Sequence, residues 1–267
     1  MTWVLHTELT LDELNLHVAA LEAAGLLGAV EQGGRASAYF HTGPLALPVE
    51  GRWEPVADQD WSETWKAGLE PVRVGDLVVT PPWRASGDVR EIVIEPAQAF
   101  GTGHHETTAG CLAALQQLAL DGARVLDVGC GSGVLAIAAA RLGAAVVAVD
   151  TDPLAVEATR HNATANGVAL DVRAGSAGDV AGAFDVVVAN LDTATLAALA
   201  RALAARLRPG GTLVASGVSR ERTDEAVTAL AAVGLDPEVR AGSEWIVLVA
   251  DARGDARQGP GSAAPGP

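Results

Sequence analysis

Three glycines, Gly129, Gly131 and Gly133, stand between an apolar run and an amphipathic run of the sequence. Glycine has no Cβ, so such a loop can turn tightly and let its backbone approach a ligand closely. The helix expected after the loop offers free N–H groups and the positive end of its dipole. Asp150 ends the next apolar run, where its carboxylate can accept hydrogen bonds from both hydroxyls of a ribose. The spacing predicts a site for a nucleotide-like cofactor.

The residues around the loop bear on which cofactor this is. Gly131-x-Gly133-x-x-Ala136 also satisfies the dinucleotide pattern, so an NAD-dependent oxidoreductase stays an alternative. Three features favour S-adenosylmethionine (SAM). Asp127, at the end of the preceding strand, suits a charged amino group and disfavours a pyrophosphate. A helix precedes the first strand, and Asn190 ends the fourth strand, where a transferred group would sit.

Each of these features also has a purely structural explanation. The glycines could form a plain strand-to-helix turn, Asp127 could cap a turn, and Asp150 could cap the helix that begins near Pro153. The ordered set on consecutive strands is harder to explain by structure alone, and this favours a binding site.

The elements that must position these residues alternate between strand and helix from residue 91 to residue 250. Continuous Val, Ala and Leu runs separated by helices predict a parallel sheet covered on both faces. A final hairpin, 237–240 with 245–249, adds an antiparallel strand. The expected strands are 124–128, 145–149, 169–174, 184–190, 212–216, 237–240 and 245–249, and the expected helices are 132–142, 153–166, 193–207 and 220–233. This α/β pattern resembles the seven-stranded, Rossmann-like domain of class I methyltransferases.

The rest of the chain divides into three further parts. Residues 1–56 read as a small α+β domain, in which Thr10 and Glu13 form a capping-box pattern and strands 26–31 and 36–41 pair. Residues 57–90 are interpreted as a linker. Four of the six tryptophans lie in or beside it, and we expect them to pack between the domains. Residues 251–267 are rich in Gly, Pro and Ala and are predicted to be disordered.

Charge and composition limit which kinds of partner, metal and cellular location are expected for this chain. The chain has 18 Lys and Arg against 33 Asp and Glu, a net charge of −15, so nucleic acid is an unexpected partner. The two cysteines lack metal-site spacing, and the adjacent His104 and His105 point different ways on a helix, so no metal is expected.

No signal peptide or membrane-spanning run is evident, which predicts a cytoplasmic protein with no membrane partner. We expect a monomer.

A second signature, Ile94-Glu-Pro-Ala-Gln-Ala-Phe-Gly-Thr-Gly-His-His-Glu-Thr-Thr108, is much more specific than the glycine loop. Together with Leu126-Asp-Val-Gly-Cys-Gly-Ser-Gly133, Val149-Asp-Thr-Asp-Pro153 and Ala189-Asn-Leu191, it resembles the ribosomal protein L11 methyltransferases. The resemblance extends to about residue 250 and includes the paired tryptophans of Asp60-Trp-Ser-Glu-Thr-Trp65. The Gly- and Pro-rich tail departs from it.

The resemblance implies a bacterial enzyme with an N-terminal substrate-recognition domain. It implies transfer of methyl groups from SAM, leaving S-adenosylhomocysteine, to lysine side chains and the N-terminal amine of ribosomal protein L11. Carried over by position, Thr108, Gly129, Asp150 and Asn190 contact SAM, and Ser176 lies near the adenine. We expect the loop Phe100-Gly101-Thr102-Gly103 to close over the methionine end. The complete predicted site is Phe100, Gly101, Thr102, Gly103 and Asn190 for catalysis and Thr108, Asp127, Gly129, Gly131, Gly133, Asp150, Ser176 and Asn190 for the cofactor.

Other functions are also compatible with the sequence. A class I N-methyltransferase could act on another protein or on a small amine. Methyltransferases of nucleic-acid bases typically carry Asn/Asp-Pro-Pro-aromatic at the fourth strand, whereas this chain has Asn190-Leu-Asp-Thr193. An oxidoreductase would need a hydride-transfer pair that the sequence does not suggest. A non-catalytic binding module that kept the fold is the last alternative.

Overall fold

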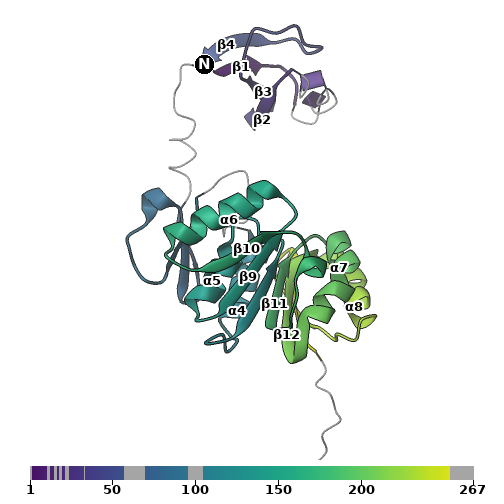
Figure 1. Cartoon of the computed structure of the whole chain (residues 1–267). Coiled ribbons are helices and arrows are strands. Elements are labelled where there is room, and N and C mark those ends of the chain that lie inside the picture. The colour runs from purple at the N-terminus through teal and green to yellow at the C-terminus, as the bar shows by residue number, and fades with distance from the viewer. Residues whose placement is uncertain are drawn as a thin grey trace, which may run out of the picture. The chain divides into compact units, whose positions relative to one another are not determined.

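The computed structural model describes residues 2–10, 13–14, 17, 20–21, 24–32, 34–56, 70–95 and 105–252. The chain forms two compact units, Met1–Leu69 and Glu70–Pro267 (Figure 1). The boundary differs from the predicted one, because residues 70–90, expected to belong to a linker, are part of the second unit. Two of the tryptophans of the predicted linker, Trp61 and Trp65, lie outside the described residues, as does the tail from residue 253.

The first unit contains an antiparallel sheet of order β2-β3-β1-β4, made of β1 (Thr2–His6), β2 (Leu26–Gln32), β3 (Arg35–Phe40) and β4 (Arg52–Val56). The predicted strand pair, β2 with β3, is confirmed, whereas β4 was not predicted. The capping box is present: the backbone N–H of Thr10 donates to Oε2 of Glu13 across 2.8 Å. Trp53 packs inside this unit, with its ring 5.2 Å from that of Phe40.

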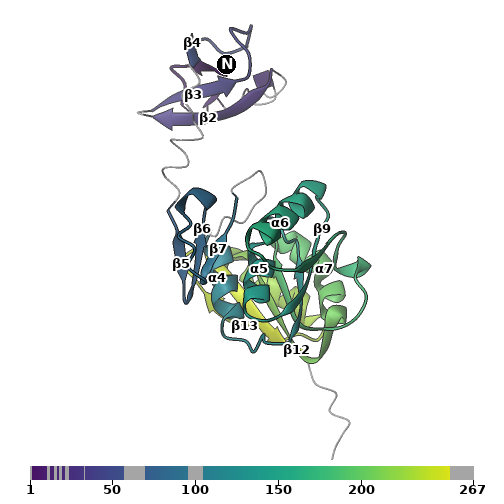
Figure 2. The same ribbon diagram turned by 60° about the vertical axis from the view of Figure 1, so that its left-hand side comes forward.

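A seven-stranded sheet forms the centre of the second unit (Figures 1 and 2). Its strand order is β10-β9-β8-β11-β12-β14-β13, and all neighbouring strands are parallel except the pairs made by β14. The strands are β8 (Arg124–Val128), β9 (Ala145–Asp150), β10 (Leu170–Ala174), β11 (Phe184–Asn190), β12 (Leu207–Ser219), β13 (Glu238–Ala241) and β14 (Trp245–Asp251). The predicted fold, including the antiparallel strand added by the final hairpin, is confirmed.

Helices cover both faces of this sheet because alternate side chains of each strand point to opposite faces. Val125 of β8 packs in a core with α4 (Glu106–Leu115), α5 (Val134–Arg141) and α6 (Pro153–Ala165). Its neighbour Leu126 packs in a second core with α7 (Thr193–Arg206) and α8 (Thr223–Ala231). Short 3-10 turns, η1 (Pro82–Arg84), η2 (Ala177–Asp179) and η3 (Arg220–Arg222), complete the described elements.

Two boundaries differ from the sequence expectation for physical reasons. The helix expected from residue 132 begins at Val134, because Gly133 adopts a left-handed conformation with φ of +83° and acts as the N-cap. Residues 208–211 separate the expected helix 193–207 from the expected strand 212–216, but they belong to β12, which runs from Leu207 to Ser219.

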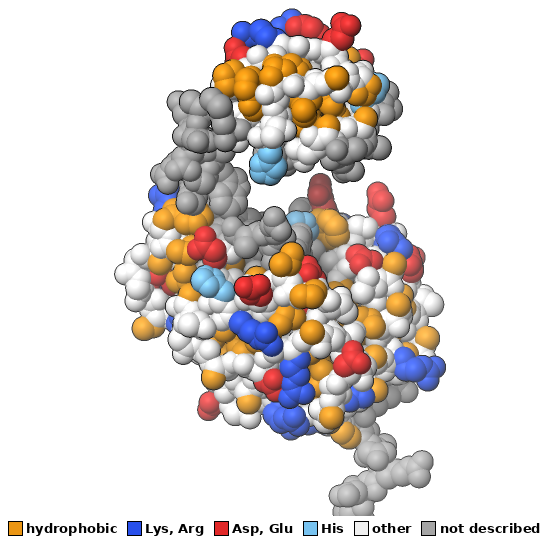
Figure 3. Space-filling view, turned by 45° about the horizontal axis from the view of Figure 1, so that its top comes forward, with side chains coloured by type: hydrophobic (Ala, Val, Ile, Leu, Met, Phe, Trp, Pro, Cys, Tyr) orange, Lys and Arg blue, Asp and Glu red, His pale blue; other side chains and the backbone are white. Residues whose placement is uncertain are grey.

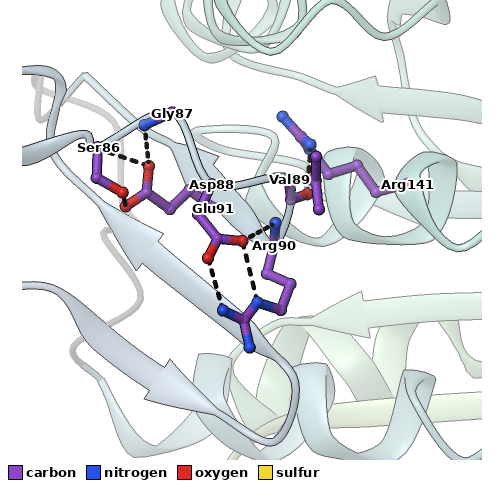
Figure 4. A network of polar contacts seen from close by, with 7 residues as sticks. All are labelled: Ser86, Gly87, Asp88, Val89, Arg90, Glu91 and Arg141. Atoms are coloured by element: carbon purple, nitrogen blue, oxygen red, sulfur yellow. Dashed lines mark hydrogen bonds and ion pairs between the residues drawn. The ribbon is translucent and has the colours of Figure 1, made fainter.

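A small sheet, β5 (Val72–Val74), β6 (Leu77–Thr80) and β7 (Glu91–Val93), belongs to the second unit as well. The buried carboxylate of Glu91 accepts hydrogen bonds from the N–H groups of Ser86 and Gly87 and from the Ser86 hydroxyl, which closes the loop between β6 and β7 (Figure 4). Arg141 of α5 donates to the carbonyl of Val89 across 2.8 Å. These contacts fix β7 against the helices that flank the central sheet.

None of the helices described is both long and apolar enough to cross a lipid bilayer. The face of the second unit seen in Figure 3 shows acidic, basic and apolar side chains interspersed. The charge of −15 is therefore not gathered into one continuous acidic patch on that face.

Candidate active site

The candidate site lies where the strand order of the central sheet reverses. From β8 the chain continues to β9 and β10 on one side, and from β11 it continues to β12 on the other. Ligands of open α/β sheets bind at such a switch point, beyond the carboxyl ends of the strands. A cavity of about 420 Å³ opens there. It is lined by Thr108, Val128, Gly129, Cys130, Gly131, Val134, Leu135, Asp150, Thr151, Asp152, Ala155, Gly175, Ser176, Asn190, Leu191, Thr195 and Leu199.

The glycine loop follows β8 directly and bends by left-handed backbone conformations. Gly129, Gly131 and Gly133 have φ of +75°, +53° and +83°, a region that only glycine adopts readily. Gly129 and Gly131 line the cavity. Gly133 lies behind it, where a Cβ would come within 2.9 Å of the Cγ2 of Thr159. The third glycine therefore allows close packing of the loop against α6.

Asp150 lies at the end of β9, on the wall of the cavity. Its Oδ2 accepts the N–H of Gly131 across 3.0 Å, and its Oδ1 accepts the N–H of Asp152 across 3.0 Å. The carboxylate is thus held in place by the glycine loop on one side and by the start of α6 on the other. This position suits the predicted bonding to ribose hydroxyls.

The opposite end of the cavity is formed by Thr108 and Asn190. His105 is the N-cap of α4 and accepts a hydrogen bond from the N–H of Thr107. The first turn of α4 then carries Thr108, which is fully buried. Nδ2 of Asn190, at the end of β11, donates to the hydroxyl of Thr108 across 3.3 Å. Two residues predicted from separate motifs therefore meet in one place.

Ser176 also lines the cavity, next to Gly175. It is the N-cap of η2, and its N–H donates to Oδ2 of Asp179 across 2.8 Å. The N–H of Gly175 donates to the carbonyl of Asp150 across 2.9 Å. The turn after β10 is therefore tied to the end of β9, on the side of the cavity where Asp150 lies.

Asp127 differs from its predicted position. Because side chains alternate along β8, Asp127 points to the same face as Val125, beneath α5. It is 1 % exposed, is not among the residues that line the cavity, and its Oδ2 accepts the N–H of Ala136 across 3.0 Å. Burial raises the pKa of this carboxyl to about 7. Its effect on the cavity is therefore indirect, through the start of α5.

The remaining predicted residues, Phe100, Gly101, Thr102 and Gly103, lie outside the described residues, so their expected closure over the cofactor stays a prediction. Sequence reasoning missed several lining residues. Thr151 and Asp152 come directly after Asp150, and Ala155 lies in the first turn of α6. Leu191 follows Asn190, and Thr195 and Leu199 lie on α7. Their place just after two strand ends is the signal that could have identified them.

The lining fits a nucleoside-containing cofactor with a polar arm. About 420 Å³ is within the usual range for a small-molecule site. Asp150 offers a carboxylate at one end, and Asn190 and Thr108 offer amide and hydroxyl groups at the other. Within the described part of the chain, no group of three or more His, Cys, Asp or Glu residues is placed to hold a metal ion.

Comparison with known proteins agrees with this geometry. A family model described as "Ribosomal protein L11 methyltransferase (PrmA)" matches residues 26–253. A protein named ribosomal protein L11 methyltransferase from Thermus thermophilus is 41% identical over 250 residues, which cover 92% of this chain and 98% of that protein. A protein of the same name from Deinococcus radiodurans is 40% identical, covering 90% and 95% of the two chains.

A solved structure of a protein with the same name has a similar fold. The crystal structure of ribosomal protein L11 methylase from Lactobacillus delbrueckii subsp. bulgaricus matches with a TM-score of 0.63 and 29% sequence identity. The match covers 69% of this chain and 100% of that one. With the family model spanning most of the chain and relatives at about 40% identity over nearly their whole length, this chain belongs to the ribosomal protein L11 methyltransferase family.

Proposed function

We propose that this chain transfers methyl groups from SAM to amino groups of ribosomal protein L11, at lysine side chains and at the N-terminal amine. The observation that carries the proposal is the cavity at the β8–β11 switch point, with Asp150 at one end and the Asn190–Thr108 pair at the other. Family membership supports the substrate. The alternative is a class I N-methyltransferase of another protein or of a small amine.

SAM supplies a methyl group already activated by the sulfonium that carries it. The chain's own residues then have to bind SAM, orient the target amine and exclude water. The amide oxygen of Asn190 is the group that can accept an N–H bond from an amine, because Nδ2 donates to Thr108. We propose that this oxygen and the backbone carbonyls beside it aim the lone pair of the amine, so that catalysis is chiefly positioning.

A target lysine must lose its proton before it reacts. Its reference pKa is about 10.4, against roughly 7.7–8.0 for an α-amine. Removing an ammonium from water lowers its pKa, so a closed, poorly solvated site can favour the neutral amine without a dedicated base. We propose that Phe100–Gly103 and Thr108 contribute to this closure, and that Ser176 lies near the adenine.

The first unit is proposed as the substrate-recognition domain, in an enzyme that acts as a monomer in the cytoplasm of a bacterial cell. Its sheet has its own hydrophobic core, which includes Leu5, Ala38 and Phe40, so it can present a surface independently of the cofactor cavity.

The test is to incubate the protein with methyl-labelled SAM and total ribosomal protein from a cell that lacks this enzyme. We expect label on L11, and mass spectrometry of its peptides then locates the modified lysines and the N-terminus. Label on another protein or on a small amine would favour the alternative. Absence of transfer to any acceptor would reject the proposal.

A further inference from the structure

Side chains of α6 hold two consecutive carbonyls of the glycine loop. The hydroxyl of Thr159 donates to the carbonyl of Gly131 across 2.9 Å. Nδ2 of Asn162 donates to the carbonyl of Ser132 across 2.8 Å. Thr159 and Asn162 are 0% and 1% exposed and lie three positions apart, so they share one face of the helix. We call this pair the α6 latch.

The two hydrogen bonds of the α6 latch fix the direction of the carbonyl groups of the glycine loop. A peptide group is planar, so fixing the direction of a carbonyl also fixes the N–H of the same plane. The loop contains three left-handed glycines, which are the residues that lose the most conformational freedom on folding. Hydrogen bonds that hold such a loop in one conformation before a ligand arrives reduce the entropy lost on binding.

The same helix also holds Asp150. Its N-cap is Asp152, whose N–H donates to Oδ1 of Asp150. Oδ2 of Asp150 accepts the N–H of Gly131, the residue whose carbonyl Thr159 binds. One rigid element, α6, therefore sets the relative position of the carboxylate and of the glycine loop, although the two follow different strands.

Asn162 has a second contact, which connects the loop to the chain after β7. Its Oδ1 accepts the N–H of Glu95 across 3.0 Å. One turn later, Asn166 binds both backbone groups of Val93, with Oδ1 accepting its N–H across 2.8 Å and Nδ2 donating to its carbonyl across 2.6 Å. Both asparagines hold this chain segment, but of the two only Asn162 has a hydrogen bond to the glycine loop among the described residues.

We propose that Thr159 and Asn162 are positioning residues for the cofactor: they set the glycine loop and Asp150 in the geometry that binds SAM, without lining the cavity themselves. This inference rests on the function proposed above and assigns it two further residues. Removing either donor deletes a hydrogen bond that holds the loop backbone, so the loop gains conformational freedom. The affinity for SAM therefore falls, while chemistry at saturating SAM stays nearly unchanged.

The structure provides matched controls on the same helix. Thr159→Val removes the hydroxyl at nearly constant shape, and Thr164→Val removes a hydroxyl that donates to the Arg160 carbonyl within α6. Asn162→Asp keeps the acceptor for Glu95 but removes the donor to Ser132. Asn166→Asp removes the donor to the carbonyls of Val93 and Asn162, neither of which belongs to the glycine loop.

Affinity for SAM is measured by titration calorimetry on the full-length chain. We expect Kd to rise at least tenfold in Thr159→Val and Asn162→Asp, and to stay within threefold of wild type in the two controls. Thr159→Ser, which keeps the hydroxyl, should retain wild-type affinity. Asn166→Asp should lower Tm, which separates a loss of stability from a loss of binding.

Hydrogen exchange of the loop amides, residues 131–133, is measured on the ligand-free protein. Exchange should accelerate in Thr159→Val and Asn162→Asp but not in Thr164→Val or Asn166→Asp. Unchanged Kd and unchanged exchange in the first two variants would overturn the inference, as would equal effects in the controls. If the wild-type chain binds no SAM, the proposed function fails, and the exchange data still decide whether the latch holds the loop. If Thr159→Val does not fold, the role of the latch is still tested by Asn162→Asp, which should weaken SAM binding, and by Thr159→Ser, which should not.

Discussion

Nδ2 of Asn190 donates to the hydroxyl of Thr108 across 3.3 Å, joining the end of β11 to the first turn of α4 over 82 positions of sequence. Thr108 is fully buried and Asn190 is partly exposed, so the bond lies on the wall of the cavity. It also orients the amide of Asn190, which leaves the amide oxygen as its acceptor.

Asn190→Ala should lower kcat about 100-fold, because a misplaced nucleophile can cost that much in rate. The affinity for SAM should change much less. Initial rates at saturating SAM and calorimetric Kd values measure the two effects separately.

Thr108→Val tests whether the pair acts as a unit. The double variant Thr108→Val/Asn190→Ala should lose little more activity than Asn190→Ala alone, since both changes break one interaction. Unchanged turnover in Asn190→Ala would contradict the assigned role.

Asp150→Ala should weaken SAM binding about 10- to 100-fold, the range expected for losing a charge-assisted hydrogen bond of about 1.5–3 kcal/mol. Turnover at saturating SAM should fall much less. Asp171→Asn, on the neighbouring strand β10, is a suitable control because Asp171 is exposed and pairs with Arg173. Intact affinity in Asp150→Ala would reject the ribose assignment.

Much of the catalytic fold could be predicted because buried parallel strands have a strong local pattern. The expected ranges 124–128 and 184–190 are those of β8 and β11. The position of Asn190 beside Thr108 could be anticipated only from the resemblance, since the bond spans 82 residues.

Other features depend on the tertiary structure and could not be predicted from the chain. Asp127 was expected to contact the cofactor, but strand alternation places it beneath α5. Thr159, Asn162 and Asn166 look like ordinary polar positions of a helix, and only the packing of α6 shows that two of them bind the loop. The strands β4, β5 and β7 lack the continuous apolar runs that reveal buried strands, whereas the apolar run Leu77–Thr80 does predict the strand that the structure shows as β6.

Gly133→Ala should destabilise the folded protein by about 1–3 kcal/mol, the usual cost of a non-glycine residue in a sparsely populated backbone region. Its φ is +83°, and an added Cβ would lie 2.9 Å from the Cγ2 of Thr159 and 3.2 Å from its Cα. Urea unfolding measures the loss. Gly178→Ala, at an exposed position where a Cβ meets nothing within 4 Å, should have a much smaller effect. Equal stability of the two variants would contradict the strain.

Asp127 should make the stability of the protein depend on pH between about 4 and 7. Burial raises the pKa of its carboxyl from 3.8 to about 7, and Oδ1 has no hydrogen-bond partner among the described residues. Below pH 4 the carboxyl is neutral in both the folded and the unfolded state. Between the two pKa values it ionises only in the unfolded state, so the folded state binds more protons and the free energy of unfolding falls as pH rises. Above pH 7 the contribution is constant.

Asp127→Asn removes this titration, and its urea unfolding should therefore depend less on pH. Between pH 5 and pH 8, wild type should lose about 3 kcal/mol relative to the variant, because about two pH units lie between pH 5 and the folded-state pKa and each contributes about 1.36 kcal/mol. Comparing the change with pH within each protein cancels any constant cost of the new amide group. Asp224→Asn, at an exposed position near the start of α8, should follow wild type. Parallel pH profiles for wild type and Asp127→Asn would mean that Asp127 is ionised in the folded protein throughout this range, with a partner that stabilises its charge.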